Sequence, residues 1–306
     1  MSFDADYLVD RRRLKRSLTW WRVLAILALV LAVAAAVGRF SGVSGVAGAA
    51  HVARMAVNGI IVDNDRRDQA LADIADDARV KALIVRVNSP GGTVVGGEAL
   101  YHNLRAVAEK KPVVVVMGEV AASAAYMTAL AGDHILAREG TVTGSIGILL
   151  QSTDLTGLLD KLGIKPESVK SSPLKAQPNP LESFTPEARE AAESVVRDLY
   201  EMFVGLVANR RELSRERAFA LADGRVYTGR QAVANGLVDA LGGEAEAREW
   251  LAESHGIPAS VPVQDVDLLG PEEKVRRLIG QVIGPNTFFS ERLRLDGLIS
   301  VWHPEL

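Results

Sequence analysis

An apolar run near the N-terminus, residues 20–40, constrains this chain more than any other feature of its sequence. Its central part, from Val23 to Gly38, carries no charged residue. As a helix, about 19 residues at roughly 1.5 Å each span about 28 Å, close to the thickness of bilayer hydrocarbon. The run therefore predicts one N-terminal transmembrane helix. A cleaved secretory signal, with Ala34–Ala36 near the cleavage site, and a buried core helix are the alternatives.

A basic cluster precedes this run and predicts its orientation. Five of the six residues from Arg11 to Arg16 are Lys or Arg. By the positive-inside rule, residues 1–19 form a cytoplasmic tail, and the rest of the chain lies outside the cytoplasm, on the periplasmic side of the inner membrane. The small, Gly-rich residues that follow predict a flexible tether over residues 41–52.

Charge divides the chain at the same place. The first 39 residues hold seven Lys or Arg and three acidic residues, a net charge of +4, which leaves −7 for the remainder of a chain whose net charge is −3. Such a body lacks the basic field that nucleic acid requires, so we expect no nucleic-acid partner. The absence of cysteine excludes a thiol nucleophile, a Cys-ligated metal and a disulfide.

The remainder predicts an α/β domain over residues 53–257. Short β-branched runs alternate with helical patterns there, which is typical of strands joined by crossover helices. The predicted strands are 57–62, 82–87, 112–117, 134–137 and 167–170, and the main predicted helices are 67–76, 94–110, 121–131, 154–162 and 185–210. Residues 258–306 form an amphipathic C-terminal extension. We expect a helix packed on the body, or else a contact with a membrane or a neighbouring subunit.

Two predicted strand ends combine small residues with serine. The second strand ends in Asn-Ser-Pro-Gly-Gly, where Gly91 and Gly92 let backbone amides approach a substrate and point at an oxyanion. Ser123 follows the third strand, at the start of a helix whose partial positive charge and Ala124 amide would favour a developing alkoxide. A simple turn at the glycines and a helix-capping role for Ser123 are the alternatives.

A serine nucleophile needs a base, and none of the five histidines lies in a serine-hydrolase motif. A lysine can replace histidine where burial away from carboxylates lowers its pKa. Lys175 lies in an acid-free stretch, with Glu167 and Glu182 as the nearest acids along the chain. Lys175 is therefore the candidate base, with plain solvent exposure in a loop as the alternative.

Five motifs together resemble the signal peptide peptidases of the short SppA type. They are RVNSPGG at 86–92, AASAAY around Ser123, TVTGSIGIL at 141–149, VKSSPLK ending at Lys175, and DGRVYTGRQAVANGLVDALGG at 223–243. The resemblance implies a membrane-anchored serine peptidase with a Ser/Lys dyad. It also implies a ClpP/crotonase-like fold of repeated β-β-α units.

The resemblance also implies roles for individual residues. Ser123 would be the nucleophile, Lys175 the general base, and Ser145 the residue that orients the lysine. The glycine pair Gly91 and Gly92, together with the amide of Ala124, would form the oxyanion hole. The chain departs from the family pattern at Ala124 and Ala125, where glycines are usual, and at Ser172. The first departure bears on the geometry of the oxyanion hole.

Further implications concern partners. The resemblance implies a homo-oligomeric ring in which serine and lysine meet across neighbouring subunits, and remnants of signal peptides as substrates. No cofactor or metal is expected. Two other functions remain open: a crotonase-type acyl-CoA hydratase or isomerase, which would need paired carboxylates, and a catalytically inactive membrane scaffold.

Overall fold

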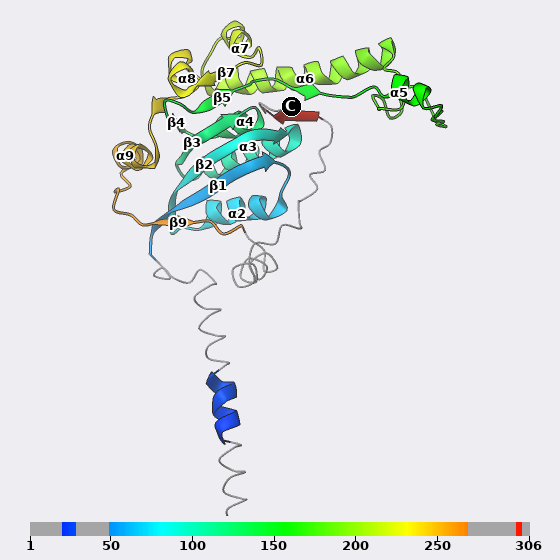
Figure 1. Cartoon of the computed structure of the whole chain (residues 1–306). Coiled ribbons are helices and arrows are strands. Elements are labelled where there is room, and N and C mark those ends of the chain that lie inside the picture. The colour runs from blue at the N-terminus through cyan, green and yellow to red at the C-terminus, as the bar shows by residue number, and fades with distance from the viewer. Residues whose placement is uncertain (1–19, 29–48, 269–297, 302–306) are drawn as a thin grey trace, which may run out of the picture. The chain divides into compact units, whose positions relative to one another are not determined.

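The computed structural model of the chain describes residues 20–28, 49–268 and 298–301 and divides into two units, Met1–Ala49 and Ala50–Leu306. In the first unit, residues 20–28 are helical (Figure 1). None of the helices in the described part of the chain is long and apolar enough to cross a bilayer. The predicted cytoplasmic tail, residues 29–40 of the predicted anchor and most of the tether lie outside the described residues.

The second unit is built on one sheet. Its strands are β1 (His51–Ile61), β2 (Val80–Thr93), β3 (Val113–Ala122), β4 (His134–Ala137), β5 (Val142–Gly144), β6 (Leu149–Leu150), β7 (Val226–Thr228), β8 (Ala240–Leu241), β9 (Val263–Asp265) and β10 (Leu298–Val301). Its helices are α2 (Asp65–Asp76), α3 (Val94–Ala108), α4 (Ala124–Ala129), α5 (Thr156–Lys161), α6 (Pro186–Arg210), α7 (Arg215–Leu221), α8 (Gly229–Asn235) and α9 (Glu244–His255). The strand β1 takes in the last two residues of the expected tether.

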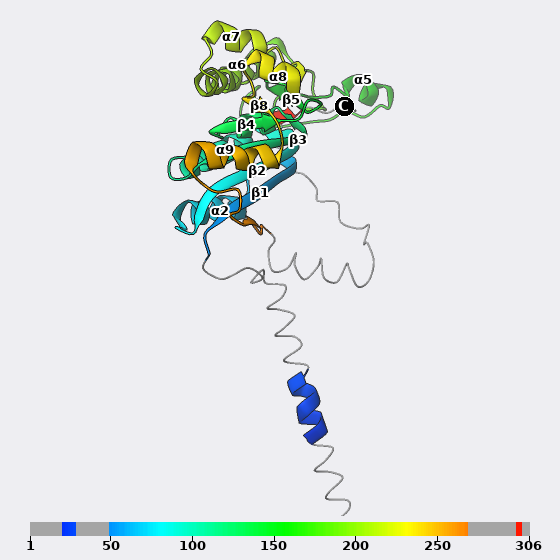
Figure 2. The same ribbon diagram turned by 90° about the vertical axis from the view of Figure 1, so that its left-hand side faces the viewer.

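The central strands confirm the predicted α/β class. β1, β2, β3 and β4 pair in parallel, and the helices α2, α3 and α4 connect them in turn (Figure 1). Val113, Val114 and Val115 of β3 have no exposed surface, as expected for a parallel strand covered on both faces. The helices α2 to α4 contribute to the larger core cluster on one face, and α9 covers the other face through Ala247 and Leu251 (Figure 2).

The structure differs from the sequence prediction at the end of β2. The sequence predicts that the second strand ends at Val87, before Asn88 to Gly92, but β2 runs through this segment to Thr93. The strand continues because β1 keeps pairing with it, with Ile60 opposite Gly91 and Ile61 opposite Gly92. The approach is close: a Cβ on Gly92 would lie 1.8 Å from the carbonyl oxygen of Ile61. The glycine therefore serves strand pairing rather than a turn.

One other predicted element is wrong. Residues 167–170 form no strand; they belong to an exposed segment. In the C-terminal extension, the described residues include two strands: β9 pairs with β1, and β10 pairs with β2 and β6. Most of the stretch expected to form a packed helix lies outside the described residues. Residues 269–297 lie outside the described part of the chain.

An arm extends from the sheet. We use this name for residues 151–185 together with the N-terminal half of α6 (Figure 1). The hydroxyl of Thr185 accepts a hydrogen bond from the amide of Ala188, which confirms the predicted helix start. Near its C-terminal end α6 buries Phe203, Val204 and Val207 against the body. The arm itself exposes eight large apolar side chains: Leu155, Leu158, Leu162, Ile164, Val169, Leu174, Leu181 and Val195.

Candidate active site

Ser123 occupies the turn between β3 and α4. Its backbone angles are φ 59° and ψ −122°, in a region that residues with a Cβ rarely adopt. Its amide donates a 2.8 Å hydrogen bond to the carbonyl of Gly144, and only 1% of the residue is exposed. A serine on a sharp, strained strand-to-helix turn is the geometry that presents a nucleophile in other hydrolase folds. The side chain makes no capping hydrogen bond to α4, so the capping alternative is not supported.

The ends of three strands bring the predicted site residues together. In the sheet, Ala121 of β3 pairs with Ser89 of β2 on one side and with Thr143 of β5 on the other. Ser123 lies two residues after Ala121, and the glycine pair of β2 directly follows Ser89 and Pro90. Ser145 follows β5. The predicted nucleophile, the predicted oxyanion strand and the predicted lysine-orienting serine thus lie at one edge of the sheet.

Ser145 is half-buried beside this edge. It also has a positive φ, 47°, and its amide donates a 2.8 Å hydrogen bond to the carbonyl of Arg225. Ser145 directly follows Gly144, whose carbonyl accepts the hydrogen bond from the amide of Ser123. The backbone of Ser145 therefore lies close to the backbone of Ser123.

The two glycines of the predicted oxyanion hole are not equivalent. The amide of Gly91 donates a 3.1 Å hydrogen bond to the hydroxyl of Ser89, which is buried. This bond uses the Gly91 donor within the chain and holds the backbone at φ 116°. Gly92 carries the other amide of the pair. Ser89 is a residue that sequence reasoning did not assign a role, although it lies inside the NSPGG motif.

Ala124 packs tightly against α3. A Cβ added to Gly97 would lie 2.9 Å from the Cβ of Ala124. Gly97 thus allows α4 to start close to α3 despite the alanine, whereas Gly96 lies against the backbone of Val62. Gly96 and Gly97 are visible as a pair in the sequence, but the sequence analysis gave them no role.

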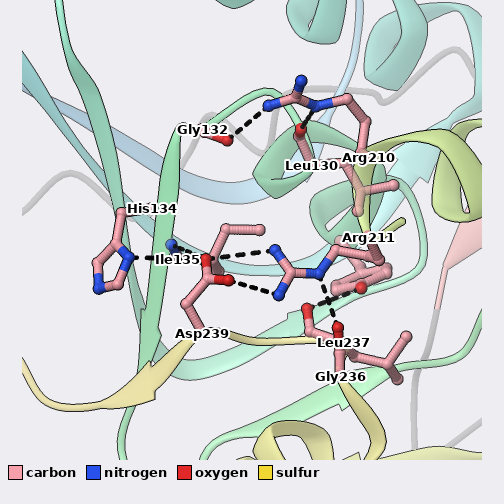
Figure 3. Close-up of polar contacts among 10 residues, drawn as sticks. Leu130, Gly132, His134, Ile135, Arg210, Arg211, Gly236, Leu237 and Asp239 are labelled. Carbon is pink, nitrogen blue, oxygen red and sulfur yellow. Dashed lines mark hydrogen bonds and ion pairs between the residues drawn. The ribbon is translucent and has the colours of Figure 1, made fainter. Parts of the chain in front are cut away.

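The far end of α4 is anchored by α6. Arg210 donates hydrogen bonds to the carbonyls of Leu130 and Gly132, which lie beyond the last turn of α4 (Figure 3). Inside the core, the hydroxyl of Tyr126 donates a 2.8 Å hydrogen bond to the carbonyl of Leu237. Burial raises the pKa of Tyr126 above its usual range. These contacts fix the helix that begins directly after Ser123.

A second cluster ties α6 to β4. Arg211 donates hydrogen bonds to both carboxylate oxygens of Asp239 and to the carbonyl of Gly236 (Figure 3). The same carboxylate accepts a 2.7 Å hydrogen bond from the amide of Ile135 and lies 3.8 Å from His134. His134 stacks on Trp250 with a centroid distance of 4.9 Å. Burial lowers the pKa of His134 despite the nearby carboxylate.

Lys175 lies on the arm and is exposed. Of the residues that the structure describes, none forms an ion pair with Lys175, and it has no hydrogen bond to Ser123. The acid nearest in the sequence, Glu182, is instead engaged by Lys170, Ser168 and Gln177. Hydrogen bonds from Lys170 and Ser168 lower the pKa of Glu182 to about 2. The burial expected of a neutral lysine is therefore not found within a single chain.

The described residues contain no cluster of three or more His, Asp or Glu side chains able to hold a metal ion. The groups gathered around Ser123 are hydroxyls and backbone amides. Such groups suit acyl transfer, in which a serine attacks a carbonyl and amides stabilise the oxyanion.

Comparisons with family models agree with this chemistry. The model of peptidase family S49 matches residues 105–257, half of the chain, and includes Ser123, Ser145 and Lys175. The Clp protease model matches residues 68–139, from α2 to β4. The ClpP-like part of the predicted fold is thus supported for the segment that contains β2, β3 and Ser123.

Individual relatives point to the same family. A protein assigned as a protease in Synechocystis sp. is 37% identical over 250 residues, which cover 79% of this chain and 89% of that protein. A protein assigned as signal peptide peptidase SppA in Enterococcus faecium is 33% identical, covering 65% of this chain and 62% of the relative. Protease 4 of Salmonella typhi is 37% identical, covering 64% and 33%.

Among solved structures, a ClpP1 variant from Listeria monocytogenes aligns with 62% of this chain and 91% of its own length, at 18% identity and a TM-score of 0.42. The sequence comparisons are the stronger finding, since both the family model and the Synechocystis relative cover the strand ends that hold Ser123. This chain belongs to peptidase family S49, with SppA-type serine peptidases among its relatives.

Proposed function

We propose that this S49 peptidase is a membrane-anchored serine endopeptidase with Ser123 as nucleophile and Lys175 of a neighbouring subunit as general base. The observation that carries the proposal is the backbone of Ser123. Its strained φ and ψ angles, buried position and hydrogen bond to Gly144 describe a residue held for chemistry at some cost in stability. A capping or packing serine has no need of such a conformation.

The proposed reaction is acyl transfer. Neutral Lys175 takes the proton from the Ser123 hydroxyl, and the serine oxygen attacks the peptide carbonyl. The amides of Gly92 and Ala124 donate hydrogen bonds to the tetrahedral oxyanion, while the Gly91 amide holds this end of β2 by its hydrogen bond to the Ser89 hydroxyl. The protonated lysine then gives its proton to the leaving amine. Water attacks the acyl-enzyme with the lysine again as base, and free Ser123 is restored.

The exposure of the arm is the reason for placing the lysine on a neighbouring subunit. Lys175 is exposed in the single chain, among apolar side chains that are also exposed; Leu162 retains 63% of its accessible surface and Leu158 55%. A cluster of exposed apolar side chains of this kind marks a contact surface. Docking of the arm on another subunit would bury Lys175, as a neutral lysine base requires. We therefore propose a homo-oligomeric ring in which Ser145 of the receiving subunit orients the incoming lysine.

The substrates proposed are apolar peptides at the membrane, including remnants of signal peptides. The apolar run of residues 20–40 and the basic cluster before it support an anchor with the body on the periplasmic side. The acyl-CoA alternative is not supported, because the family match is to a peptidase. The inactive-scaffold alternative predicts no reaction of Ser123 with serine-directed reagents.

A subunit-mixing experiment tests the shared dyad. The full-length Ser123→Ala and Lys175→Ala variants are each expected to be inactive on a fluorogenic apolar peptide. When the two are dissociated and reassembled together, some sites combine an intact Ser123 with an intact Lys175, and activity returns. Mixing either variant with itself is the control. If each variant is inactive alone and mixed assemblies also stay inactive, the shared dyad is wrong.

A further inference from the structure

The pairing of β3 with β2 is interrupted shortly before β3 turns into α4. Val87 of β2 lies opposite Met117 of β3. The next paired residues are Ser89 and Ala121, so two steps along β2 correspond to four steps along β3. Residues 118–120 therefore form a bulge with two extra residues. Because the number of extra residues is even, the side chains keep their faces, but β3 is displaced along β2.

This displacement sets which residue of β2 lies level with the proposed nucleophile. Uninterrupted pairing would bring Ser123 level with Thr93. With the bulge, Ser123 and Gly91 each lie two residues beyond the last pair of the two strands. At about 3.3 Å per residue, the difference amounts to about 6–7 Å. The bulge thus brings Ser123 alongside the start of the glycine pair.

The side chain of Asn88 holds the bulge from β2. Its Oδ1 atom accepts hydrogen bonds from the amides of Glu119 and Val120, at 3.0 and 3.1 Å. The backbone of β2 has no residue in register with these two amides, so the carboxamide oxygen takes the place of a backbone acceptor. The contact also needs a glycine at position 118, since a Cβ on Gly118 would lie 2.9 Å from the Asn88 oxygen.

Two buried threonines, Thr141 and Thr143, hold the rest of this part of β3. The hydroxyl of Thr141 donates a 2.7 Å hydrogen bond to the carbonyl of Gly118. The hydroxyl of Thr143 donates a 2.6 Å hydrogen bond to the carbonyl of Ala121. Asn88, in contrast, is exposed. Its side chain can therefore be changed without opening the core.

We infer that Asn88 is a positioning residue for the proposed peptidase reaction: by holding the bulge of β3, it keeps Ser123 in line with the oxyanion strand. The inference rests on the proposed function for the reaction, whereas the hydrogen bonds of Asn88 do not depend on it. Oxyanion donors act mainly in the transition state, so misalignment is expected to lower kcat and to leave KM nearly unchanged. A displacement of about 1 Å can cost about 100-fold in rate.

Three substitutions in the full-length protein test this role. Asn88→Ala removes the acceptor, whereas Asn88→Asp keeps an oxygen acceptor and is expected to rescue activity. Asn58→Ala is the matched control, because Asn58 pairs with Asn88 in the sheet and its side chain makes no hydrogen bond to any residue that the structure describes. For a fluorogenic apolar peptide, kcat is expected to fall at least about tenfold in Asn88→Ala, with KM within about twofold of wild type. In Asn88→Asp and Asn58→Ala, kcat should stay within about threefold of wild type.

Amide hydrogen exchange tests the hydrogen bonds of Asn88 separately from catalysis. It is measured in the same three variants, each combined with Ser123→Ala so that no cleavage intervenes. The amides of Glu119 and Val120 are expected to exchange at least about tenfold faster in Asn88→Ala than in the other two variants. Equal exchange in all three would overturn the inference, whatever the activity.

The kinetic results separate this inference from the proposed function. Faster exchange in Asn88→Ala together with an unchanged kcat, in a protein whose wild type is active, would overturn the positioning role alone. A wild-type protein that neither cleaves the peptide nor reacts at Ser123 with a fluorophosphonate would overturn the proposed function and, with it, the positioning role.

Discussion

The amide of Ser123 donates a 2.8 Å hydrogen bond to the carbonyl of Gly144, one residue before Ser145. This bond ties the turn that carries the proposed nucleophile to the strand that carries the proposed lysine-orienting serine. It also helps to hold Ser123 at φ 59°, where a side chain is strained. The site is therefore assembled by backbone contacts between strand ends, and the two hydroxyl side chains are positioned as a consequence.

Two substitutions at Ser123 report on this strain. Ser123→Ala removes the hydroxyl but keeps the Cβ, whereas Ser123→Gly also relieves the strain of about 1–3 kcal/mol. Glycine ordinarily costs about 0.5–1 kcal/mol relative to alanine. We expect both variants to be inactive and Ser123→Gly to be at least as stable as Ser123→Ala in urea unfolding. If Ser123→Gly is instead less stable than Ser123→Ala by about 0.5–1 kcal/mol, the backbone at this position is unstrained.

Gly92 is expected to tolerate no side chain. A Cβ there would lie 1.8 Å from the carbonyl oxygen of Ile61, so β1 and β2 would have to separate. Gly92→Ala should cost about 1–3 kcal/mol or more of unfolding free energy and abolish peptidase activity. Gly140→Ala is the control, since nothing lies within 4 Å of its added Cβ. Similar stabilities for the two variants would contradict the close strand pairing.

The hydroxyl of Tyr126 is expected to matter for stability but not for chemistry. Tyr126→Phe leaves the carbonyl of Leu237 without its buried donor, at a cost of about 1–2 kcal/mol. The rate of Ser123 labelling should stay within about twofold of wild type under native conditions. Tyr101→Phe, at a tyrosine whose hydroxyl bonds to none of the described residues, should change stability little. A loss of labelling in folded Tyr126→Phe would instead point to a role of this anchor in shaping the site.

Stability is expected to fall as pH drops through the titration of His134. Its pKa is lower in the folded protein than the value of about 6.5 in an unfolded chain, because burial disfavours the charged ring. Above about pH 6.5 both states hold the neutral ring, and below it the unfolded state binds more protons, so the folded state loses stability. The difference between the urea unfolding midpoints at pH 7.5 and pH 5.5 should be smaller in His134→Gln than in wild type. An identical pH dependence in the two proteins would exclude His134 as a contributor.

The apolar side chains of the arm are expected to hold the assembly. Leu158→Glu together with Leu162→Glu places charge on the exposed face of α5 and its end, and should shift the protein towards monomer in analytical ultracentrifugation. Val95→Glu, at a side chain that is 52% exposed on α3 rather than on the arm, is the control. Peptidase activity should fall with the assembly, because Lys175 would then lack a neighbouring Ser123. A monomer that retains full activity would rule out the shared dyad.

Local patterns in the sequence predicted most of the body. The valine-rich run of β3, the strand β4 and the capped start of α6 follow from β-propensity, burial and the Thr185 cap, all of which depend on near neighbours. Local patterns did not predict that β2 continues through Pro90 and Gly91. These residue types are typical of a turn, and the segment is extended because it pairs with β1. Residues 167–170 have strand-like sequence but lack a partner in the sheet.

The sequence indicates which residues are candidates for the site, but it does not show how they are connected. Ser123 and the glycine pair stand out as small residues at strand ends, which a sequence displays. The hydrogen bond that commits the Gly91 amide to Ser89, and the pairing of β10 with Gly91 to Thr93, join residues that only the tertiary fold brings together. The role proposed for Lys175 depends in addition on a second subunit, which the sequence does not display.

The most direct test of the central claim is labelling of the full-length, assembled protein with a fluorophosphonate probe, followed by mass spectrometry of the modified peptide. The account predicts a single modified residue, Ser123, with no labelling in Ser123→Ala and strongly reduced labelling in Lys175→Ala. Equal labelling of wild type and Ser123→Ala, or modification of a different serine, would contradict it.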